Sequence, residues 1–133
     1  YDIPDLKLCP VPSQPVPILI GGHSKLALKR AAKLGDGWIS AGITLEETKD
    51  FINQINSYRE EFGTLDHPNY QFQVMGEAAY SPDGVKALED LGATEVIVAF
   101  RNAYEGGPDE RTLDSMKAEI SWYAEEVINK FRS

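Results

Sequence analysis

Short apolar runs alternate with amphipathic helical patterns along the chain, and this unit repeats four times. Each unit takes roughly 30 residues and contains an apolar run, a loop, a helical pattern and a break. A strand-then-helix order predicts parallel strands joined by right-handed crossovers. The runs expected to form strands are 18–20, 37–40, 70–76 and 95–100.

The first unit shows how the expected helices begin and end. Ser24 can cap the helix that follows it, and Gly35 can end that helix in a left-handed turn. Its expected apolar stripe contains Leu28, Ala31, Ala32 and Leu34.

The later helices carry similar signals. Thr44 and Glu47 form a capping box before a helix that runs to Phe62, and residues 81–82 pair a capping serine with a first-turn proline. Pro108 marks the start of the last helix. Its expected apolar face contains Leu113, Met116, Ile120, Tyr123, Val127 and Phe131.

The size of the units suggests the architecture. A (β/α)8 TIM barrel takes about 250 residues, so four consecutive βα units correspond to half of one. An open doubly wound sheet is the alternative. The run 95–100 is apolar without alternation, as expected of a strand covered on both faces. Residues 1–17 hold five of the eight prolines, which predicts an extended connector before a half-barrel at 18–133 and hints at a larger protein.

Composition and charge narrow the range of partners. A net charge of -8 argues against nucleic acid and anionic membranes, which bind clustered Lys and Arg. No apolar stretch approaches the ~20 residues of a membrane span, and no signal peptide is recognisable, so a cytoplasmic location is expected. Cys9 lacks a neighbouring histidine and is interpreted as inert. The two histidines and one cysteine share no zinc-binding spacing.

Candidate binding residues lie in the loops after the strands, because α/β proteins bind ligands there. In the loop 21–24, glycines let an oxyanion approach the backbone, and a helix start adds free N–H groups and the hydroxyl of Ser24. A tight turn with a capped helix would use the same residues, so the spacing alone leaves both interpretations open.

Other candidates have two interpretations as well. His23 could contact a phosphate, act as a base, or be a solvated loop histidine, whereas His67 is interpreted as incidental. Trp38 could belong to the core or stack on a ligand. Glu77 and Arg101 follow strand ends and are candidates for the rim of a substrate pocket, or else surface charges.

The stretch "PVPILIGGHSKLALKRAAKLGDGWIS" resembles the luciferase-like monooxygenase family, whose members carry P-x-P-I-x-I-G-G-x-S followed by R-A-A-x-x-G-D-G-W. The later stretch "LEDLGATEVIVAF" is common to many barrels and is less diagnostic. The matching positions are Pro15, Pro17, Ile18, Ile20, Gly21, Gly22, Ser24, 30–32 and 35–38.

The resemblance implies the carboxyl-terminal half of a (β/α)8 barrel that uses FMN or the deazaflavin coenzyme F420 to oxidise or reduce a small organic substrate. In F420-using relatives the Gly-Gly turn lies against the coenzyme phosphate, which carries over to Gly21 and Gly22, with His23 and Ser24 adjacent. The loop after the next strand adds Ser40 and Ala41 to the expected cofactor-binding residues.

Departures from the family pattern limit what is implied. Relatives that act on sugar phosphates have a lysine where this chain has residues 40–44, so a phosphorylated sugar is not expected.

The family's amino-terminal half supplies the catalytic acid or base and most contacts to the redox ring. The chain alone is therefore expected to be inactive, with the missing half-barrel as partner. A homo-oligomer is also expected, with Trp122 as a candidate contact. The rival hypothesis is a non-catalytic half-barrel that binds a phosphorylated ligand or a partner chain.

Overall fold

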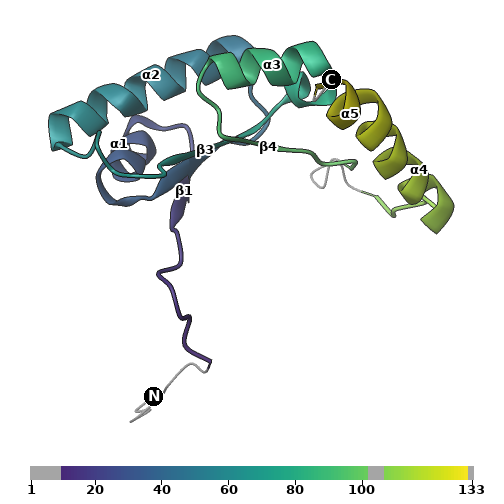
Figure 1. The fold of residues 1–133 in the computed structure, drawn as a ribbon, viewed down its shortest axis with the longest axis horizontal. Helices are drawn as coiled ribbons and strands as arrows, with labels where there is room; N and C mark the ends of the chain where they lie inside the picture. The colour runs from purple at the N-terminus through teal and green to yellow at the C-terminus, as the bar shows by residue number, and fades with distance from the viewer. Residues whose placement is uncertain (1–9, 102–106, 132–133) are drawn as a thin grey trace.

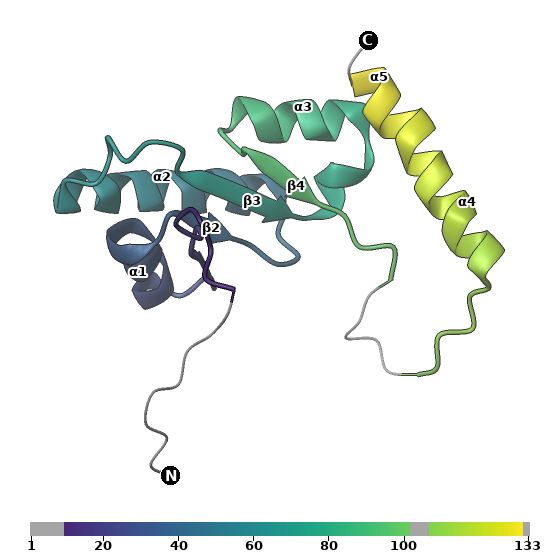
Figure 2. The same cartoon turned by 60° about the horizontal axis from the view of Figure 1, so that its bottom comes forward.

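The computed structural model describes residues 10–101 and 107–131. Cys9, the first half of the predicted connector and most of the loop 101–107 lie outside the described residues. Residues 10–17 form no helix or strand, and they lead away from the folded part of the chain (Figures 1 and 2). The connector therefore stays a prediction.

Four parallel strands form one sheet in the order of the chain. They are β1 (Leu19–Gly21), β2 (Gly37–Ile39), β3 (Gln71–Met75) and β4 (Glu95–Ile97). A doubly wound sheet would reverse its strand order at a switch point, whereas here each strand pairs with the next one. The predicted βα units are confirmed, and the consecutive order is that of part of a barrel whose sheet this chain leaves open.

A helix or helical segment follows each strand, as predicted. The helices are α1 (Lys25–Leu34), α2 (Leu45–Phe62), α3 (Pro82–Asp90), α4 (Leu113–Tyr123) and α5 (Asn129–Phe131). A short 3-10 turn, η1 (Glu77–Tyr80), precedes α3, and a π-helical turn, η2 (Ala124–Ile128), joins α4 to α5. Helices α2 and α3 cover one face of the sheet, while α4 leads away from it (Figures 1 and 2).

The core lies between the sheet and its helices. Strand β3 buries Phe72 and Val74 toward the helices and alternates them with half-buried glutamines, as the sequence pattern predicts. Trp38 of β2 is fully buried, so its interpretation as a core residue is confirmed. The other large core residues include Leu28, Ile52, Ile55 and Leu88.

Two details of α1 differ from the prediction. Gly35 ends the helix with extended backbone, φ -91° and ψ 155°, and not in a left-handed turn. Glycine is needed there because a Cβ would lie 2.9 Å from the carbonyl oxygen of Gly37 and 3.0 Å from that of Ala31. Leu34 is exposed, because six residues beyond Leu28 correspond to about 240° around a helix of 3.6 residues per turn.

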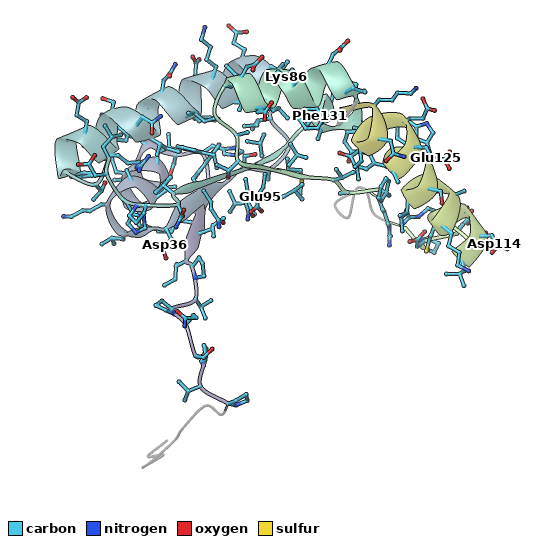
Figure 3. The ribbon with its side chains drawn as sticks, in the orientation of Figure 1. Asp36, Lys86, Glu95, Asp114, Glu125 and Phe131 are labelled. Atoms are coloured by element: carbon cyan, nitrogen blue, oxygen red, sulfur yellow. The ribbon has the colours of Figure 1, made fainter. Side chains whose placement is uncertain are left out.

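The fourth βα unit differs from the prediction in the length and the coverage of its strand. Strand β4 stops at Ile97 and not at Phe100, because β3 ends at Met75, the residue that pairs with Ile97. Strand β4 is not covered on both faces as predicted. Glu95 lies on the side of β4 away from α3 (Figure 3), where its carboxylate accepts a hydrogen bond from the side-chain amide of Gln73 at 2.7 Å.

The last helix begins later than Pro108 suggests. Its N-cap is Thr112, whose side chain accepts from the N–H of Ser115 at 3.2 Å. Only part of the expected apolar face is buried, since α4 diverges from the sheet. Tyr123 and Val127 are buried, whereas Leu113, Ile120 and Phe131 are exposed.

Candidate functional site

The turn after β1 is held against the core by one side chain. The indole Nε1 of Trp38 donates to the carbonyl of Gly22 at 2.9 Å. Gly22 has a φ of +111°, which favours glycine, and a Cβ there would lie 3.0 Å from the Cβ of Ala27. The backbone geometry therefore requires glycine at this position, whether or not a ligand binds.

The start of α1 provides hydrogen-bond donors next to this turn. Ser24 caps the helix, because its hydroxyl accepts from the N–H of Ala27 at 3.3 Å, as predicted. The first-turn amides of Lys25 and Leu26 precede any helix carbonyl to which they could donate. The hydroxyl of Ser24 can still donate its own proton, and residues 21–24 are exposed. The arrangement can accommodate an anion such as a phosphate.

His23 joins this turn to the loop after β2. Its Nε2 accepts from the N–H of Ala41 at 3.3 Å, which requires the tautomer with the proton on Nδ1. The ring stacks on Phe51, with centroids 5.1 Å apart and an interplanar angle of 17°. The imidazole thus has a fixed position between two loops.

Ser40 lies behind the loop surface and Ala41 lies on it. Ser40 is buried, and its hydroxyl accepts from the N–H of Met75 at 2.9 Å, which extends the pairing of β2 with β3. The side chain therefore fixes the backbone from which Ala41 projects. Ala41 is exposed and is the residue of this pair that can face a ligand.

An open pocket of about 1040 Å³ lies at the carboxyl ends of β2, β3 and β4. Its walls are mainly apolar side chains and backbone, and among the described residues its charged members are Glu77 and Arg101. The lining residues are Ala41, Gly42, Ile43, Thr44, Leu45, Met75, Gly76, Glu77, Ala78, Tyr80, Ser81, Gly84, Ala99 and Arg101.

Two loops pack closely to shape the wall of this pocket. The N–H of Ile43 donates to the carbonyl of Met75 at 3.2 Å. A Cβ on Gly76 would overlap the carbonyl oxygen of Ile43, so glycine is required by this close approach. The loops after β2 and β3 therefore form one continuous surface.

Arg101 belongs to a small charged network. Its guanidinium donates to the carbonyl of Gly107 at 3.0 Å and lies 3.5 Å from the carboxylate of Asp109. Arg111 makes two hydrogen bonds of 2.9 Å to that same carboxylate and donates to the carbonyl of Phe100 at 2.8 Å. The hydrogen bonds from Arg111, with a smaller effect of Arg101, lower the pKa of Asp109 to about 2.

The structure brings the predicted site residues together in two adjoining places. Ala41, Glu77 and Arg101 line the pocket, and residues 21–24 form the turn beside it, linked by the contact between His23 and Ala41. Sequence reasoning missed Tyr80, which lines the pocket and bonds the backbone of Ala99. Its signal was only a tyrosine in a loop that follows a strand.

His67 has a structural role instead of a place in the pocket. Its Nε2 lies 3.2 Å from the carboxylate of Asp36. Asp36 also accepts from the N–H of Ile18 at 2.7 Å, so its side chain fixes the entry of the chain into β1. Asp36, the acidic residue of the Gly-Asp-Gly-Trp stretch, therefore has a structural role.

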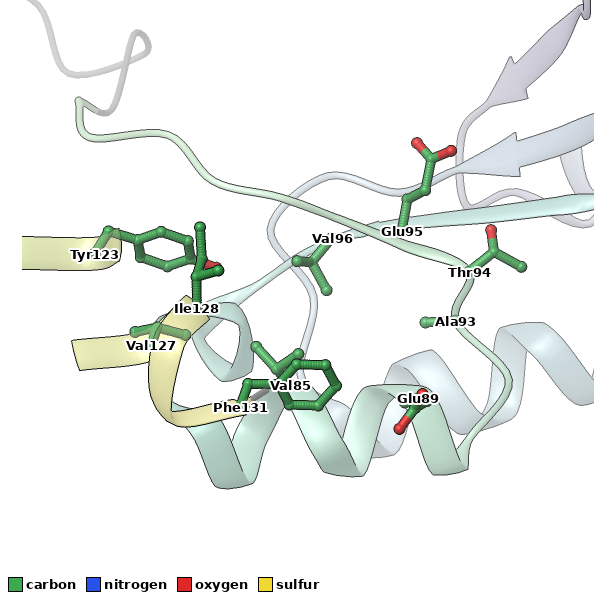
Figure 4. A pocket seen from close by; sticks show the side chains of 10 residues that line it. All are labelled: Val85, Glu89, Ala93, Thr94, Glu95, Val96, Tyr123, Val127, Ile128 and Phe131. Carbon is green, nitrogen blue, oxygen red and sulfur yellow. The ribbon is translucent and has the colours of Figure 1, made fainter. Parts of the chain in front are cut away.

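A second pocket, of about 300 Å³, lies where the last helix meets α3 and β4 (Figure 4). Val85, Val96, Val127 and Phe131 contribute apolar walls. Glu89 is a charged lining residue, whereas Glu95 lines the pocket with its carboxylate pointing away from α3 (Figure 4). None of the predicted site residues lines it.

Residues 10–101 and 107–131 contain neither a metal-binding cluster nor a membrane-spanning helix. Within these ranges, no three side chains of the metal-ligating kinds gather at one place. None of the helices described there combines the length and the apolar character that a membrane crossing requires.

Comparison with known proteins gives one family. A family model described as luciferase-like monooxygenase matches residues 1–125. The uncharacterized proteins Rv0940c of Mycobacterium tuberculosis and Mb0965c of Mycobacterium bovis are each 42% identical to this chain over 130 residues. The matches cover 98% of this chain and 44% of each relative, so the chain spans less than half the length of these proteins. No solved structure gives a significant match.

Proposed function

Because the chain belongs to the luciferase-like monooxygenase family, we propose that it forms part of an oxidoreductase that uses FMN or F420 and acts on a small organic substrate. Members of this family are generally oxidoreductases or monooxygenases. The observation that carries the proposal is the turn 22–24, which Trp38 holds beside an open pocket at the carboxyl edge of the sheet.

In this proposal the residues of the chain bind and orient. The amides of Lys25 and Leu26 and the hydroxyl of Ser24 hold the coenzyme phosphate, and His23 and Ala41 contact its neighbouring atoms. Ser40 keeps Ala41 in place through its hydrogen bond with Met75. When bound, FMN or F420 supplies the redox chemistry, while the protein supplies position and electrostatics.

The rest of the barrel belongs to the same proposal. The sheet is open at β1 and β4, and apolar residues such as Leu113 and Ile120 are exposed on α4. We propose that an amino-terminal half-barrel covers these edges and provides the catalytic acid or base, so that this chain alone is inactive. We also propose that the full-length protein is a cytoplasmic homo-oligomer that binds neither nucleic acid nor membranes.

The test is a fluorescence titration of the full-length protein with FMN, riboflavin and F420. The variant Ser24→Asp keeps an N-cap oxygen but places a carboxylate where the phosphate would lie. We expect FMN affinity to fall about tenfold through like-charge repulsion while the affinity for riboflavin, which lacks the phosphate, changes little. A matched control is Thr112→Asp, which adds the same charge at the cap of α4.

Three results would contradict the proposal. In the first, neither FMN nor F420 binds below the millimolar range. In the second, Ser24→Asp leaves the affinity for the coenzyme that does bind unchanged. In the third, the variant weakens riboflavin binding as much as FMN binding. Binding of inorganic phosphate without either coenzyme would favour a non-catalytic half-barrel that takes a phosphorylated ligand.

A further inference from the structure

The pocket at the carboxyl ends of β2, β3 and β4 combines apolar walls with one preorganised cation. Ile43, Leu45, Met75 and Ala78 supply apolar surface, and Arg101 is the basic residue that lines the pocket among those described. A guanidinium in such surroundings matches a ligand with an apolar body and one anionic end.

Arg101 has hydrogen-bonding capacity left for such a ligand. Within residues 10–101 and 107–131, one of its five N–H donors is used, in a hydrogen bond of 3.0 Å to the carbonyl of Gly107. Asp109 lies 3.5 Å away, beyond the length of a good charge-assisted hydrogen bond. Since Arg111 already makes two bonds of 2.9 Å to Asp109, that carboxylate satisfies Arg101 only in part.

The same contacts hold the guanidinium in place. Gly107 and Asp109 fix its direction, and Arg111 anchors Asp109 through the carbonyl of Phe100 and the carboxylate of Glu119. A preorganised donor loses less conformational entropy when a ligand binds than a free surface arginine does. The network therefore positions Arg101 instead of only neutralising it.

The charge of the pocket selects the kind of anion. Glu77 also lines it, so the two charged lining residues carry opposite signs. The whole chain carries a net charge of -8, which disfavours polyanions in general. One planar guanidinium fits the two oxygens of a carboxylate, whereas a dianionic phosphate calls for more donors than this pocket offers.

We propose that the substrate of this pocket is a small, largely apolar carboxylic acid whose carboxylate pairs with Arg101. The inference rests on the proposed function for the statement that the ligand is a substrate, and on the pocket alone for its chemical class. Arg101 is a specificity-determining residue in this view, and the apolar wall formed by the loops after β2 and β3 receives the hydrocarbon part.

The test measures selectivity between an acid and its uncharged analogue. Butanoate, hexanoate and octanoate and their primary amides are titrated into the full-length protein, and binding is followed by NMR chemical-shift changes. We expect the longest acid to bind about tenfold more tightly than its amide. In Arg101→Gln the ratio should fall to about one, and in Arg101→Lys, which cannot bind in a bidentate way, it should be intermediate.

The matched control is Arg30→Gln, which removes the same charge from an exposed position on α1 and should leave the ratio unchanged. Equal affinity for acids and amides, no binding of any probe, or selectivity that survives in Arg101→Gln would each overturn the inference. Titration of the unmodified full-length protein with FMN and F420 separates the two proposals. If the unmodified protein selects carboxylates over amides but binds neither coenzyme, this inference stands and the proposed function fails.

Discussion

The hydroxyl of Tyr80 pairs with both backbone polar groups of Ala99. It donates to the carbonyl at 2.7 Å and accepts from the N–H at 3.0 Å. Strand β4 has ended at Ile97, so this side chain replaces the partner that β3 no longer offers. The segment that leads to Arg101 is thereby attached to the turn η1.

Replacing Tyr80 by Phe should loosen that segment. The loss of the two hydrogen bonds at this exposed site should cost about 1 kcal/mol of unfolding free energy. We expect faster hydrogen exchange at the amide of Ala99 and weaker selectivity for the carboxylate probes. Tyr58→Phe is the control, since the hydroxyl of Tyr58 has no hydrogen-bond partner within the described ranges. Unchanged exchange at Ala99 would show that the contact does not hold this segment.

Removing the negative charge of Asp109 should strengthen carboxylate binding. Asp109→Asn takes away the anion that competes for Arg101, and we expect octanoate to bind about threefold more tightly. Asp114→Asn, on the outside of α4 (Figure 3), should have no effect. Weaker octanoate binding in Asp109→Asn would mean that the network serves mainly to orient the guanidinium.

The pH dependence of this network follows from the pKa of Asp109, which hydrogen bonds from Arg111 lower from 3.8 to about 2. A depressed carboxyl pKa contributes stability that is present above pH 3.8 and is lost as the pH falls toward 2. Octanoate selectivity should therefore be unaffected by Asp109 titration between pH 6 and pH 8, as the same NMR titration would check.

A buried tyrosine should make the fold sensitive to alkali. Burial raises the pKa of Tyr70 to about 12, an effect that Arg59, whose guanidinium carbon lies 3.9 Å from the ring centroid, only partly offsets. Because the folded-state pKa exceeds its usual value of 10.0, this stabilisation is complete below pH 10 and is lost as the pH rises toward 12.

Tyr70→Phe should remove this alkaline loss, as measured by urea unfolding between pH 8 and pH 12. At neutral pH the variant should be as stable as the parent or slightly more so. The buried hydroxyl of Tyr70 has no hydrogen-bond partner among the described residues, and deleting it removes an unsatisfied group. Tyr58→Phe should keep the alkaline loss. A strongly destabilised Tyr70→Phe would reveal a partner for the hydroxyl.

The close contact of two loops predicts a sharp difference between two glycines. Gly76→Ala forces a methyl group against the carbonyl of Ile43 and should cost about 1–3 kcal/mol of unfolding free energy. In Gly21→Ala the new Cβ meets the side chain of Ile39 at 3.4 Å and its carbonyl oxygen at 3.8 Å, which are ordinary contacts, and the change should cost less than about 0.5 kcal/mol. Equal effects in urea unfolding would mean that the loops separate readily.

The starts of the helices were predicted well because capping depends on residues that are close together in the sequence. Thr44 and Glu47 form the capping box three residues apart, and Ser24 caps its helix as expected. The prediction of a left-handed turn at Gly35 is wrong because the next residue, Asp36, donates its N–H to the carbonyl of Ile18 at 2.8 Å, and this contact with a distant residue cannot be recognised from the local sequence. Strand β4 was predicted too long since its length depends on where β3 ends.

The candidate site was predictable to the level of loops and not of atoms. The rule that strand ends carry the ligand placed Ala41, Glu77 and Arg101 at one edge, where they line one pocket. The same rule could not tell that Ser40 would turn inward to Met75 or that Tyr80 would turn to Ala99. Such orientations depend on contacts between residues that are far apart in the sequence, such as Ser40 and Met75, which are 35 residues apart.

The hydrogen bond from the N–H of Ala41 to His23 has a consequence for how two ligands would change each other's affinity. It joins the turn proposed for the coenzyme phosphate to a wall of the carboxylate pocket, so that one ligand restricts the loop the other must contact. Thermodynamic linkage then requires reciprocity: whatever factor the coenzyme adds to the affinity for the acid, the acid adds to the affinity for the coenzyme.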